Sequence, residues 1–412
     1  MTSKEKHCRF CRAKLQHVFA DLGMSPLANS YVSKDRLAER ESFFPLCAYV
    51  CGECLLVQLE EFESPREIFS DYAYFSSYSD SWLKHAKEFA DDAAARFHLS
   101  ESSQVVEVAS NDGYLLQYFA SKGIRVLGID PAENVAAVAE QKGVPTLVKF
   151  FGAATARELA TRGLLADLLI GNNVLAHVPD LNDFVKGLRT LLHPTGVITM
   201  EFPHLMRLIV ENQFDTIYHE HFSYFSFHTV EKIFSAHGLK VYDVEKLQTH
   251  GGSLRIFACL AGHSARPETP AVTCLKKREQ DTGLTELRTY LKFGERVKKC
   301  KRELLNFLIH AKQQNRTVVG YGAPAKGNTL LNYCGIRADF LDYTVDVSPH
   351  KQGLYLPGTR LPIYAPEKLR ETRPDYVLVL PWNLIDEITE QHAYIKEWGG
   401  RFVIPVPRPR VC

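Results

Sequence analysis

The sequence lacks an excess of charge of either sign. Its 412 residues include 49 Lys and Arg against 48 Asp and Glu, which leaves a formal net charge of +1. No global electric field therefore recruits nucleic acid or an anionic membrane, and any anionic ligand has to be held locally. Hydrophobic residues make up 45% of the chain, as in a globular protein, and the length suffices for two or three domains.

Long apolar runs and matched cysteine spacings are also scarce. The first residues, MTSKEKHCRFC, contain no apolar segment of the kind found in signal peptides, and no apolar run reaches the length of a membrane span. Six of the 10 cysteines are scattered along the chain, which argues against a disulfide framework. These absences predict a soluble cytoplasmic protein with no nucleic-acid or membrane partner, and we expect a monomer or weak oligomer.

The other four cysteines form two close pairs near the N-terminus. Each pair has the spacing CxxC, which lets two thiolates bind one ion from a tight turn, and Gly52 is expected to relax the second turn. Four thiolates complete the shell of a structural Zn²⁺ and leave no position for a catalytic water. The predicted ligands are Cys8, Cys11, Cys51 and Cys54. A redox CxxC or an iron–sulfur cluster is the alternative, and His7 or Cys47 could substitute in the shell.

A nucleotide-binding pattern follows between Val105 and Asp130. A buried strand, a turn of small residues, a helix and a second strand place backbone and a terminal carboxylate where they can bind a nucleoside. The turn lacks the full GxGxxG, because Ala109 and Asn111 stand where glycines would. A pyrophosphate at the helix N-terminus would need those glycines, so the turn favours S-adenosylmethionine over NAD.

A third strand, which begins at Ala166, leads into polar residues, the position where α/β sheets hold ligands. His177 is expected to face the same pocket. The predicted cofactor-binding residues are Glu107, Ala109, Asn111, Gly113, Asp130, Asn172 and Asn173. Further along, His250 and Gly251 precede a closing strand, and the glycine lets backbone approach a substrate.

The segment Tyr218–His221 has four proton-handling side chains in succession. No regular element buries four consecutive side chains on one side. The aromatic residues that follow would ordinarily be buried, which favours a proton-transfer pocket over a His-rich surface turn. Tyr72 lies on an aromatic, hydroxyl-rich loop before a helix predicted from about Asp80 to Phe97, where it either donates a phenol hydrogen bond to a ligand or packs.

The C-terminal region predicts a second α/β fold. Leucines at helical spacing between Cys274 and Gln313 indicate a connecting helix. A strand then enters a glycine-rich turn, whose glycines can admit a phosphate that Lys326 would neutralise. Asn328 and Asp346 are further candidates for ligand contact, and a purely structural fold is the alternative.

Six motifs in order resemble one family. They are the paired CxxC, EVASNDGYLL, NNVLAHVPDL, YHEHFSYFS, HGGSLR and GYGAPAKGNTLL. In this order they look like the sugar C-methyltransferases that act on nucleotide-linked 4-keto deoxyhexoses, and the resemblance spans almost the whole chain. It implies S-adenosylmethionine as donor, a nucleoside-diphosphate 4-keto sugar as acceptor and carbon 3 as the methylated atom.

The resemblance also implies roles for individual residues. The last His of the YxEH stretch serves as the base, which carries over to His221, while Tyr218 and Glu220 match the preceding positions. Tyr72 and His177 occupy positions that line the pocket.

The resemblance implies that the C-terminal domain helps to hold the nucleotide diphosphate of the sugar, and Lys326, Asn328 and Asp346 are the residues we expect to make that contact. The chemistry of the site is consistent with an enolate mechanism. A neutral imidazole suits proton removal beside a ketone, phenols or a second imidazole suit the enolate oxygen, and Glu220 is expected to orient His221.

We therefore expect an α/β protein with a zinc-binding domain (1–70), a Rossmann-like methyltransferase domain (71–265), and a linker helix with a C-terminal Rossmann-like domain (266–412). The alternatives are methyl transfer to a hydroxyl or amine, a non-catalytic zinc-ribbon scaffold and a dehydrogenase built on the C-terminal glycines.

Overall fold

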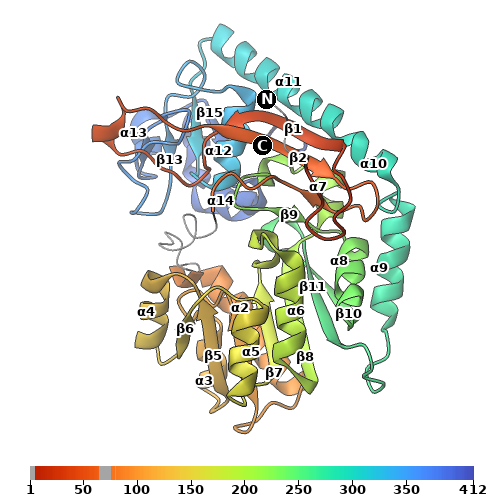
Figure 1. The fold of residues 1–412 in the computed structure, drawn as a ribbon. Helices are drawn as coiled ribbons and strands as arrows, with labels where there is room; N and C mark the ends of the chain where they lie inside the picture. The colour runs from red at the N-terminus through yellow and green to blue at the C-terminus, as the bar shows by residue number, and fades with distance from the viewer. Residues whose placement is uncertain (1–4, 65–75, 79) are drawn as a thin grey trace. The chain divides into compact units, whose positions relative to one another are not determined.

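The computed structural model describes residues 5–64, 76–78 and 80–412 (Figure 1). The chain divides into two compact units. Unit 1 contains the residues up to Leu15, Cys51–His204 and Phe222–Thr285, and unit 2 contains Gln16–Val50, Leu205–His221 and Glu286–Cys412. An N-terminal strand pair and the segment with the Tyr218–His221 motif belong to the same unit as the C-terminal residues.

Unit 1 is organised around a seven-stranded sheet with the order β10-β11-β8-β7-β4-β5-β6. The strands from β8 to β6 are parallel, whereas β11 and β10 continue the sheet in antiparallel pairing. The strands are β4 (Gln104–Val108), β5 (Arg125–Asp130), β6 (Thr146–Val148), β7 (Ala166–Asn172), β8 (Leu192–Pro203), β10 (Leu239–Leu247) and β11 (Ser253–Leu260). A short antiparallel pair, β3 (Val57–Gln58) with β9 (Ser223–Tyr224), completes the strands of this unit.

Alternating side chains of the parallel strands enter two hydrophobic cores. Val105 and Leu168 belong to one core, and their neighbours Val106 and Leu169 belong to the other. A sheet buried on both faces produces the near-continuous apolar strands seen in the sequence. The covering helices are α2 (Asp80–Arg96), α3 (Leu116–Ala120), α4 (Glu133–Gln141), α5 (Ala153–Thr161), α6 (Leu181–Leu191), α8 (Phe227–Ala236) and α9 (Pro270–Asp281). Short 3₁₀ turns are η2 (Ser76–Tyr78), η3 (Leu175–His177) and η5 (Thr249–Gly251).

Unit 2 is built on a six-stranded sheet with the order β14-β13-β12-β15-β16-β17, parallel except for β17. The strands are β12 (Val318–Tyr321), β13 (Thr344–Val345), β14 (Ile363–Tyr364), β15 (Tyr376–Val379), β16 (Arg401–Ile404) and β17 (Arg410–Val411). The helices are α7 (Leu205–Val210), α10 (Leu287–Leu291), α11 (Phe293–Gln313), α12 (Ala325–Cys334), α13 (Lys368–Thr372) and α14 (Ile385–Gln391). Its 3₁₀ turns are η1 (Lys34–Arg36), η4 (Phe214–Thr216), η6 (Trp382–Leu384) and η7 (Ala393–Trp398).

The N-terminal strands β1 (His17–Ser25) and β2 (Phe44–Val50) form an antiparallel pair within unit 2. The ring of Phe19 stacks on Phe293 of α11 at 4.5 Å, and both rings are buried. Aromatic burial of this kind accounts for the attachment of an N-terminal segment to C-terminal helices.

The prediction of a single connecting helix between Cys274 and Gln313 is wrong in the number of helices, since three, α9, α10 and α11, occupy the region. Gly283 takes a left-handed conformation (φ 78°), and the Leu284 amide turns back to the Glu279 carbonyl. A left-handed residue ends a helix, and glycine adopts it without steric cost.

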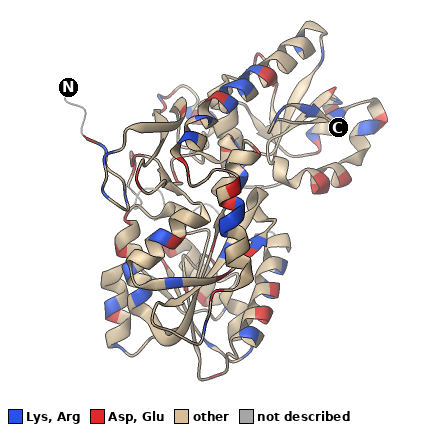
Figure 2. Cartoon of the chain, turned by 90° about the vertical axis from the view of Figure 1, so that its right-hand side faces the viewer, with Lys and Arg blue, Asp and Glu red and all other residues tan. Residues whose placement is uncertain are grey.

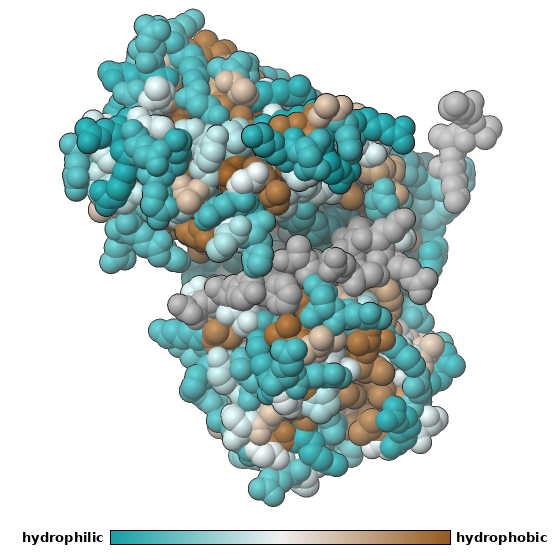
Figure 3. Space-filling view, turned by 90° about the vertical axis from the view of Figure 1, so that its left-hand side faces the viewer, coloured by the Kyte–Doolittle hydropathy of each residue, from teal (hydrophilic) through white to brown (hydrophobic). Residues whose placement is uncertain are grey.

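Charges of both signs are interspersed along the helices (Figure 2), in keeping with the near-zero net charge. On the face drawn in Figure 3, hydrophobic residues lie in small groups among polar ones. Among the helices in the described ranges, none combines the length and apolar sequence needed to cross a membrane.

Candidate functional site

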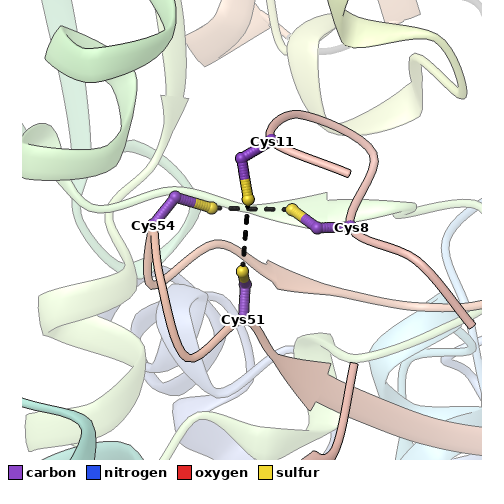
Figure 4. A group of neighbouring side chains, drawn as sticks. All are labelled: Cys8, Cys11, Cys51 and Cys54. Atoms are coloured by element: carbon purple, nitrogen blue, oxygen red, sulfur yellow. Dashed lines mark hydrogen bonds between the residues drawn. The ribbon is translucent and has the colours of Figure 1, made fainter. Parts of the chain in front are cut away.

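The four N-terminal cysteines converge in unit 1 (Figure 4). Their sulfur atoms all lie within 4.8 Å of one another, and the Cys8–Cys54 and Cys11–Cys51 sulfurs are 3.5 Å apart. These separations suit four thiolates around one tetrahedral Zn²⁺. Among the described residues this is the only His, Cys, Asp and Glu group with metal-binding geometry, so His7 and Cys47 are not part of the shell.

The geometry of the two turns differs from the expectation for Gly52. The residues that follow each pair, Arg12 and Leu55, are left-handed (φ 65° in both), whereas Gly52 has no positive φ. The Gln58 side-chain amide donates to the Cys8 sulfur at 3.3 Å. Hydrogen bonds from Cys51 and Cys54 lower the pKa of the Cys8 thiol, whereas burial raises the pKa of the Cys11 thiol and hydrogen bonds with Cys51 and Cys8 raise that of Cys54. A metal that binds all four sulfurs therefore has to displace the remaining thiol protons.

The turn after β4 has the backbone that the sequence suggested. Ala109, Asn111 and Gly113 are all left-handed, with φ of 57°, 49° and 74°. The Asn111 side chain accepts from the Ser76 amide at 2.9 Å. Ala109 and Asn111 therefore adopt the conformation for which glycines usually serve.

Asp130, at the end of β5, stabilises this turn by hydrogen bonding. Its carboxylate accepts from the backbone amides of Asn111 and Ala132, both at 2.9 Å. Burial raises the pKa of Asp130, although these two hydrogen bonds oppose the shift. Each carboxylate oxygen retains a lone pair with which it could accept from a ribose hydroxyl.

Buried polar atoms without partners gather at the carboxyl ends of β4 and β7. Within the described ranges, the carboxylate oxygens of Glu107 and the Oδ1 atoms of Asn172 and Asn173 make no hydrogen bond of good geometry, although the Tyr114 side chain lies close to Glu107 and Asn172. Burial raises the pKa of Glu107. Unsatisfied buried acceptors are costly unless a ligand or water donates to them. They fit the ammonium and hydroxyl donors of S-adenosylmethionine.

The predicted catalytic residues are distributed over both units. His177 lies in η3 of unit 1, just beyond the polar end of β7, and Tyr72 lies outside the described residues. Tyr218, Glu220 and His221 belong to unit 2. His219 packs within unit 2, where its ring contacts the Phe44 ring edge-on. Burial lowers the pKa of His219.

The His221 ring is held by its own chain segment. Its Nδ1 lies 3.2 Å from the Thr216 carbonyl oxygen, and its Nε2 lies 2.8 Å from the Tyr218 hydroxyl. Because a carbonyl oxygen only accepts, Nδ1 carries the proton and Nε2 presents the basic lone pair. Sequence reasoning missed Thr216, since a backbone acceptor leaves no trace in residue identity.

The expectation that Glu220 orients His221 is wrong. The Glu220 carboxyl is buried, and its Oε1 accepts from the Asn29 side-chain amide at 2.7 Å. Burial raises the pKa of Glu220 to about 7. No charged partner offsets that burial in the described part of the chain, so the acid is readily neutral.

The glycine-rich turn after β12 is filled by protein atoms. A Cβ on Gly322 would come within 2.4 Å of the Pro381 Cδ, and Gly320 and Gly327 would also meet neighbouring side chains closer than 3.0 Å. The Ala323 amide, which could bind a phosphate, donates to Asp346 at 2.7 Å. The expectation that these glycines make room for phosphate does not hold, because they permit close packing.

Lys326 and Asn328 are also engaged within unit 2. Lys326 donates to the Asn383 side chain at 2.6 Å and lies over the Trp382 ring, and Asn328 donates to the Ala28 carbonyl at 2.6 Å. Burial lowers the pKa of Lys326. Contacts of these residues with a nucleotide sugar stay a prediction.

His250 and Gly251 lie on a left-handed loop at the start of β11. Both have positive φ, 56° and 84°, and His250 is exposed. The loop therefore presents an imidazole and open backbone beside the carboxyl-terminal ends of the parallel strands.

Three family models match the chain. They describe a zinc-binding domain (residues 8–69), a methyltransferase domain (residues 82–244) and a C-methyltransferase C-terminal domain (residues 248–407). Among curated proteins, the C-methyltransferase NovU of Streptomyces niveus is 39% identical over 98% of this chain and 96% of its own length. A ubiquinone biosynthesis O-methyltransferase of Rhizobium etli (strain CIAT 652) is 29% identical over 26% of this chain and 47% of its own.

Solved structures resemble parts of the chain. The PH0226 protein of Pyrococcus horikoshii OT3 is 17% identical, covering 48% of this chain and 99% of that one with a TM-score of 0.38. Magnesium protoporphyrin IX methyltransferase of Synechocystis PCC 6803 is 18% identical, covering 47% and 91%, with a TM-score of 0.35. With the near-full-length match to NovU and the three domain models, the chain belongs to the C-methyltransferase family, enzymes of the S-adenosylmethionine-dependent methyltransferase class.

Proposed function

We propose that this enzyme methylates carbon 3 of a nucleoside-diphosphate-linked 4-keto deoxysugar, with His221 as the base, in branched deoxysugar biosynthesis. The observation that carries the proposal is the His221 ring, whose Nδ1 faces the Thr216 carbonyl and whose Nε2 is thereby left basic. A base beside a ketone needs that lone pair to remove a proton from carbon.

In the proposed reaction, His221 Nε2 takes the proton from carbon 3, and the C–H electrons move to the carbonyl oxygen to give an enolate. The Tyr218 hydroxyl, 2.8 Å from Nε2, can turn to donate to that oxygen. S-adenosylmethionine, when bound, supplies the electrophilic methyl group. Carbon 3 forms the new C–C bond as the S–C bond breaks, and the sulfur keeps the electron pair.

The same arrangement revises the role of Glu220. With its Oε1 held by Asn29, the neutral acid is proposed to donate to a sugar oxygen instead of pairing with the imidazole. His177 and Tyr72 are proposed as further donors to the substrate. Glu107, Asn172 and Asn173 are proposed to bind the donor, supported by their unpaired buried oxygens.

The decisive experiment supplies labelled methyl donor with a panel of thymidine-, guanosine- and cytidine-linked 4-keto sugars and locates the label by mass spectrometry. Label on carbon supports the proposal, and label on oxygen or nitrogen contradicts it. Absence of binding heat with S-adenosylmethionine would instead favour a non-catalytic scaffold.

The base is tested with His221→Asn, whose amide can still donate to Thr216. We expect turnover to fall by about 10²- to 10⁴-fold, with binding of both ligands retained. His310→Asn is a matched control, because the Nδ1 of this exposed histidine also bonds a backbone carbonyl, that of Asn306. Unchanged turnover in His221→Asn would dismiss it as the base.

A further inference from the structure

Glu201, near the end of β8, is a buried carboxylate with three side-chain partners. The Thr249 hydroxyl donates to its Oε1 at 3.0 Å, and Arg255 donates to its Oε2 at 3.0 Å. The His85 Nε2 also lies 3.0 Å from Oε2. The side chain of Glu201 is 0% exposed, and these three contacts are its side-chain hydrogen bonds among the described residues.

The burial of the Glu201 charge is offset by His85 and by Arg255. Arg255 also pairs with Glu245, at 3.2 Å. It stands opposite Glu201 in the register of β8 and β11, and its side chain is 7% exposed. A buried carboxylate requires such a partner. Thr249 is additional, and it comes from a loop that the ion pair does not need.

The loop that contains Thr249 is strained. His250, Gly251 and Gly252 are left-handed in succession, with φ of 56°, 84° and 115°. A left-handed residue other than glycine costs about 1–2 kcal/mol, so surrounding contacts have to hold it. The Gly252 amide and the Ser253 hydroxyl both donate to the Thr249 carbonyl, at 2.9 and 3.0 Å, which makes Thr249 the fixed end of the loop.

Two further contacts connect this group with the ligand-binding end of the sheet. The Asn173 amide donates to the Glu201 carbonyl at 2.7 Å, at the turn proposed to bind the donor. The Trp82 ring stacks on His85 at 5.0 Å and meets the His250 ring edge-on at 5.4 Å. Trp82 therefore lies between His85 and the His250 tip of the loop.

A second buried His–Glu pair in unit 1 shows what a structural role looks like. His204 and Glu279 are 2.6 Å apart, and Glu279 accepts from the backbone amides of Phe227 and His228 at the start of α8. That carboxylate caps a helix. In the described part of the chain Glu201 bonds no helix terminus, and its side chain bonds Thr249, at the start of a left-handed loop with an exposed histidine at its tip.

We propose that Glu201 is a positioning residue that acts through Thr249 to hold the His250–Gly252 loop in the conformation that contacts the acceptor. This rests on the proposed function, because the acceptor is the keto sugar named there. The Glu201 carbonyl accepts from the Asn173 amide through the backbone, so a substitution of the Thr249 side chain leaves that bond in place. We therefore expect loss of the Thr249 contact to weaken binding of the acceptor and not of the donor.

Thr249→Val tests the proposal in the full-length zinc-loaded enzyme, because it removes the hydroxyl at nearly constant volume. We expect faster deuterium exchange at the Gly252 amide and a KM for the keto sugar raised about tenfold, the effect of losing one hydrogen bond to a charged group. The KM for S-adenosylmethionine is expected to stay within about twofold. Thr249→Ser, which retains the hydroxyl, is expected to restore both readouts.

Thr269→Val is the matched control, because it removes another threonine-to-carboxylate bond of unit 1, from Thr269 to Asp243 at 2.5 Å. It is expected to change neither loop exchange nor KM. Unchanged exchange in Thr249→Val, or an equal rise of both KM values, overturns the proposal. If the wild-type enzyme methylates no keto sugar, the proposed function fails, and the exchange comparison still decides whether Thr249 and Glu201 hold the loop.

Discussion

The turns that follow β4 and β12 are opposite in character although they occupy equivalent positions in two parallel sheets. The turn after β4 has one glycine and leaves buried oxygens of Glu107 and Asn172 without partners in the described ranges. The turn after β12 also has one glycine, Gly322, with Gly320 in β12 and Gly327 in α12 close by, and the space beside Gly322 is taken by Pro381. Unpaired buried acceptors, and not the number of glycines, indicate which turn can take a ligand.

Removal of zinc is expected to give the largest difference between the units. Binding of structural zinc contributes about 10–16 kcal/mol in small zinc domains. Chelation should therefore expose amides around Cys8–Cys11 and Cys51–Cys54 in unit 1 before those of β12 and α12 in unit 2, as measured by deuterium exchange. Cys11→Ser should lose the metal, whereas Cys47→Ser, outside the cluster, should keep it. Equal exchange in both units would contradict the expectation.

The filled turn is tested with Gly322→Ala. The added Cβ would clash with Pro381, and φ is 85°, so overpacking of about 1–3 kcal/mol adds to a backbone cost of about 1 kcal/mol. Gly335→Ala is the control, because it has a similar φ of 73° but nothing within 4 Å. Denaturant unfolding should show the larger loss for Gly322→Ala. Equal losses would mean that the turn has room for a ligand.

The open turn is tested with S-adenosylmethionine. At 100 times its Kd a ligand stabilises the folded state by about 2.7 kcal/mol, which thermal unfolding detects. Glu107→Gln should weaken this protection, because the carboxylate is proposed to accept from the donor. Glu140→Gln, an exposed acid of α4, should leave it unchanged. Protection unaffected by Glu107→Gln would remove Glu107 from the donor site.

The diphosphate role of Lys326 is tested with Lys326→Met. Because Lys326 is held by Asn383 and Trp382, we expect stability to fall while the KM for the nucleotide sugar changes by less than about threefold. A rise of about tenfold or more would restore Lys326 as a ligand of the diphosphate.

A change of pH is expected to act on two buried acids in opposite ways. Burial raises the pKa of Glu201, but hydrogen bonding with His85 and the charge of Arg255 outweigh it and lower the pKa overall. Its stabilisation is therefore present above the unfolded pKa and is lost as the pH falls. Burial raises the pKa of Glu220 to about 7, so the folded state holds a proton that the unfolded state releases, and stability falls as the pH rises from about 4.5 to 7.

The variants Glu220→Gln and Glu201→Gln separate these contributions. Glu220→Gln should flatten the decline of the unfolding free energy toward pH 7, whereas Glu201→Gln should remove part of the loss on the acid side. Denaturant titrations over the pH range measure both. A Glu220→Gln variant with the same decline as the wild type would show that the carboxyl is already ionised.

The sequence by itself determined the features that depend on local spacing. Paired CxxC motifs identify a four-thiolate metal site, and the strand–turn–helix order around Glu107 predicts a ligand-binding turn, because neighbours in sequence set both geometries. The apolar strands of a doubly covered sheet follow from the same local pattern.

Only the tertiary structure decided the partners that come from distant parts of the chain. Glu220 is held by Asn29, 191 positions away, and Glu201 by Thr249, 48 positions away. Whether the space beside Gly322 is open or taken by Pro381 is equally a matter of long-range packing. Residue identity states which atoms can donate or accept, but folding alone determines which of them meet.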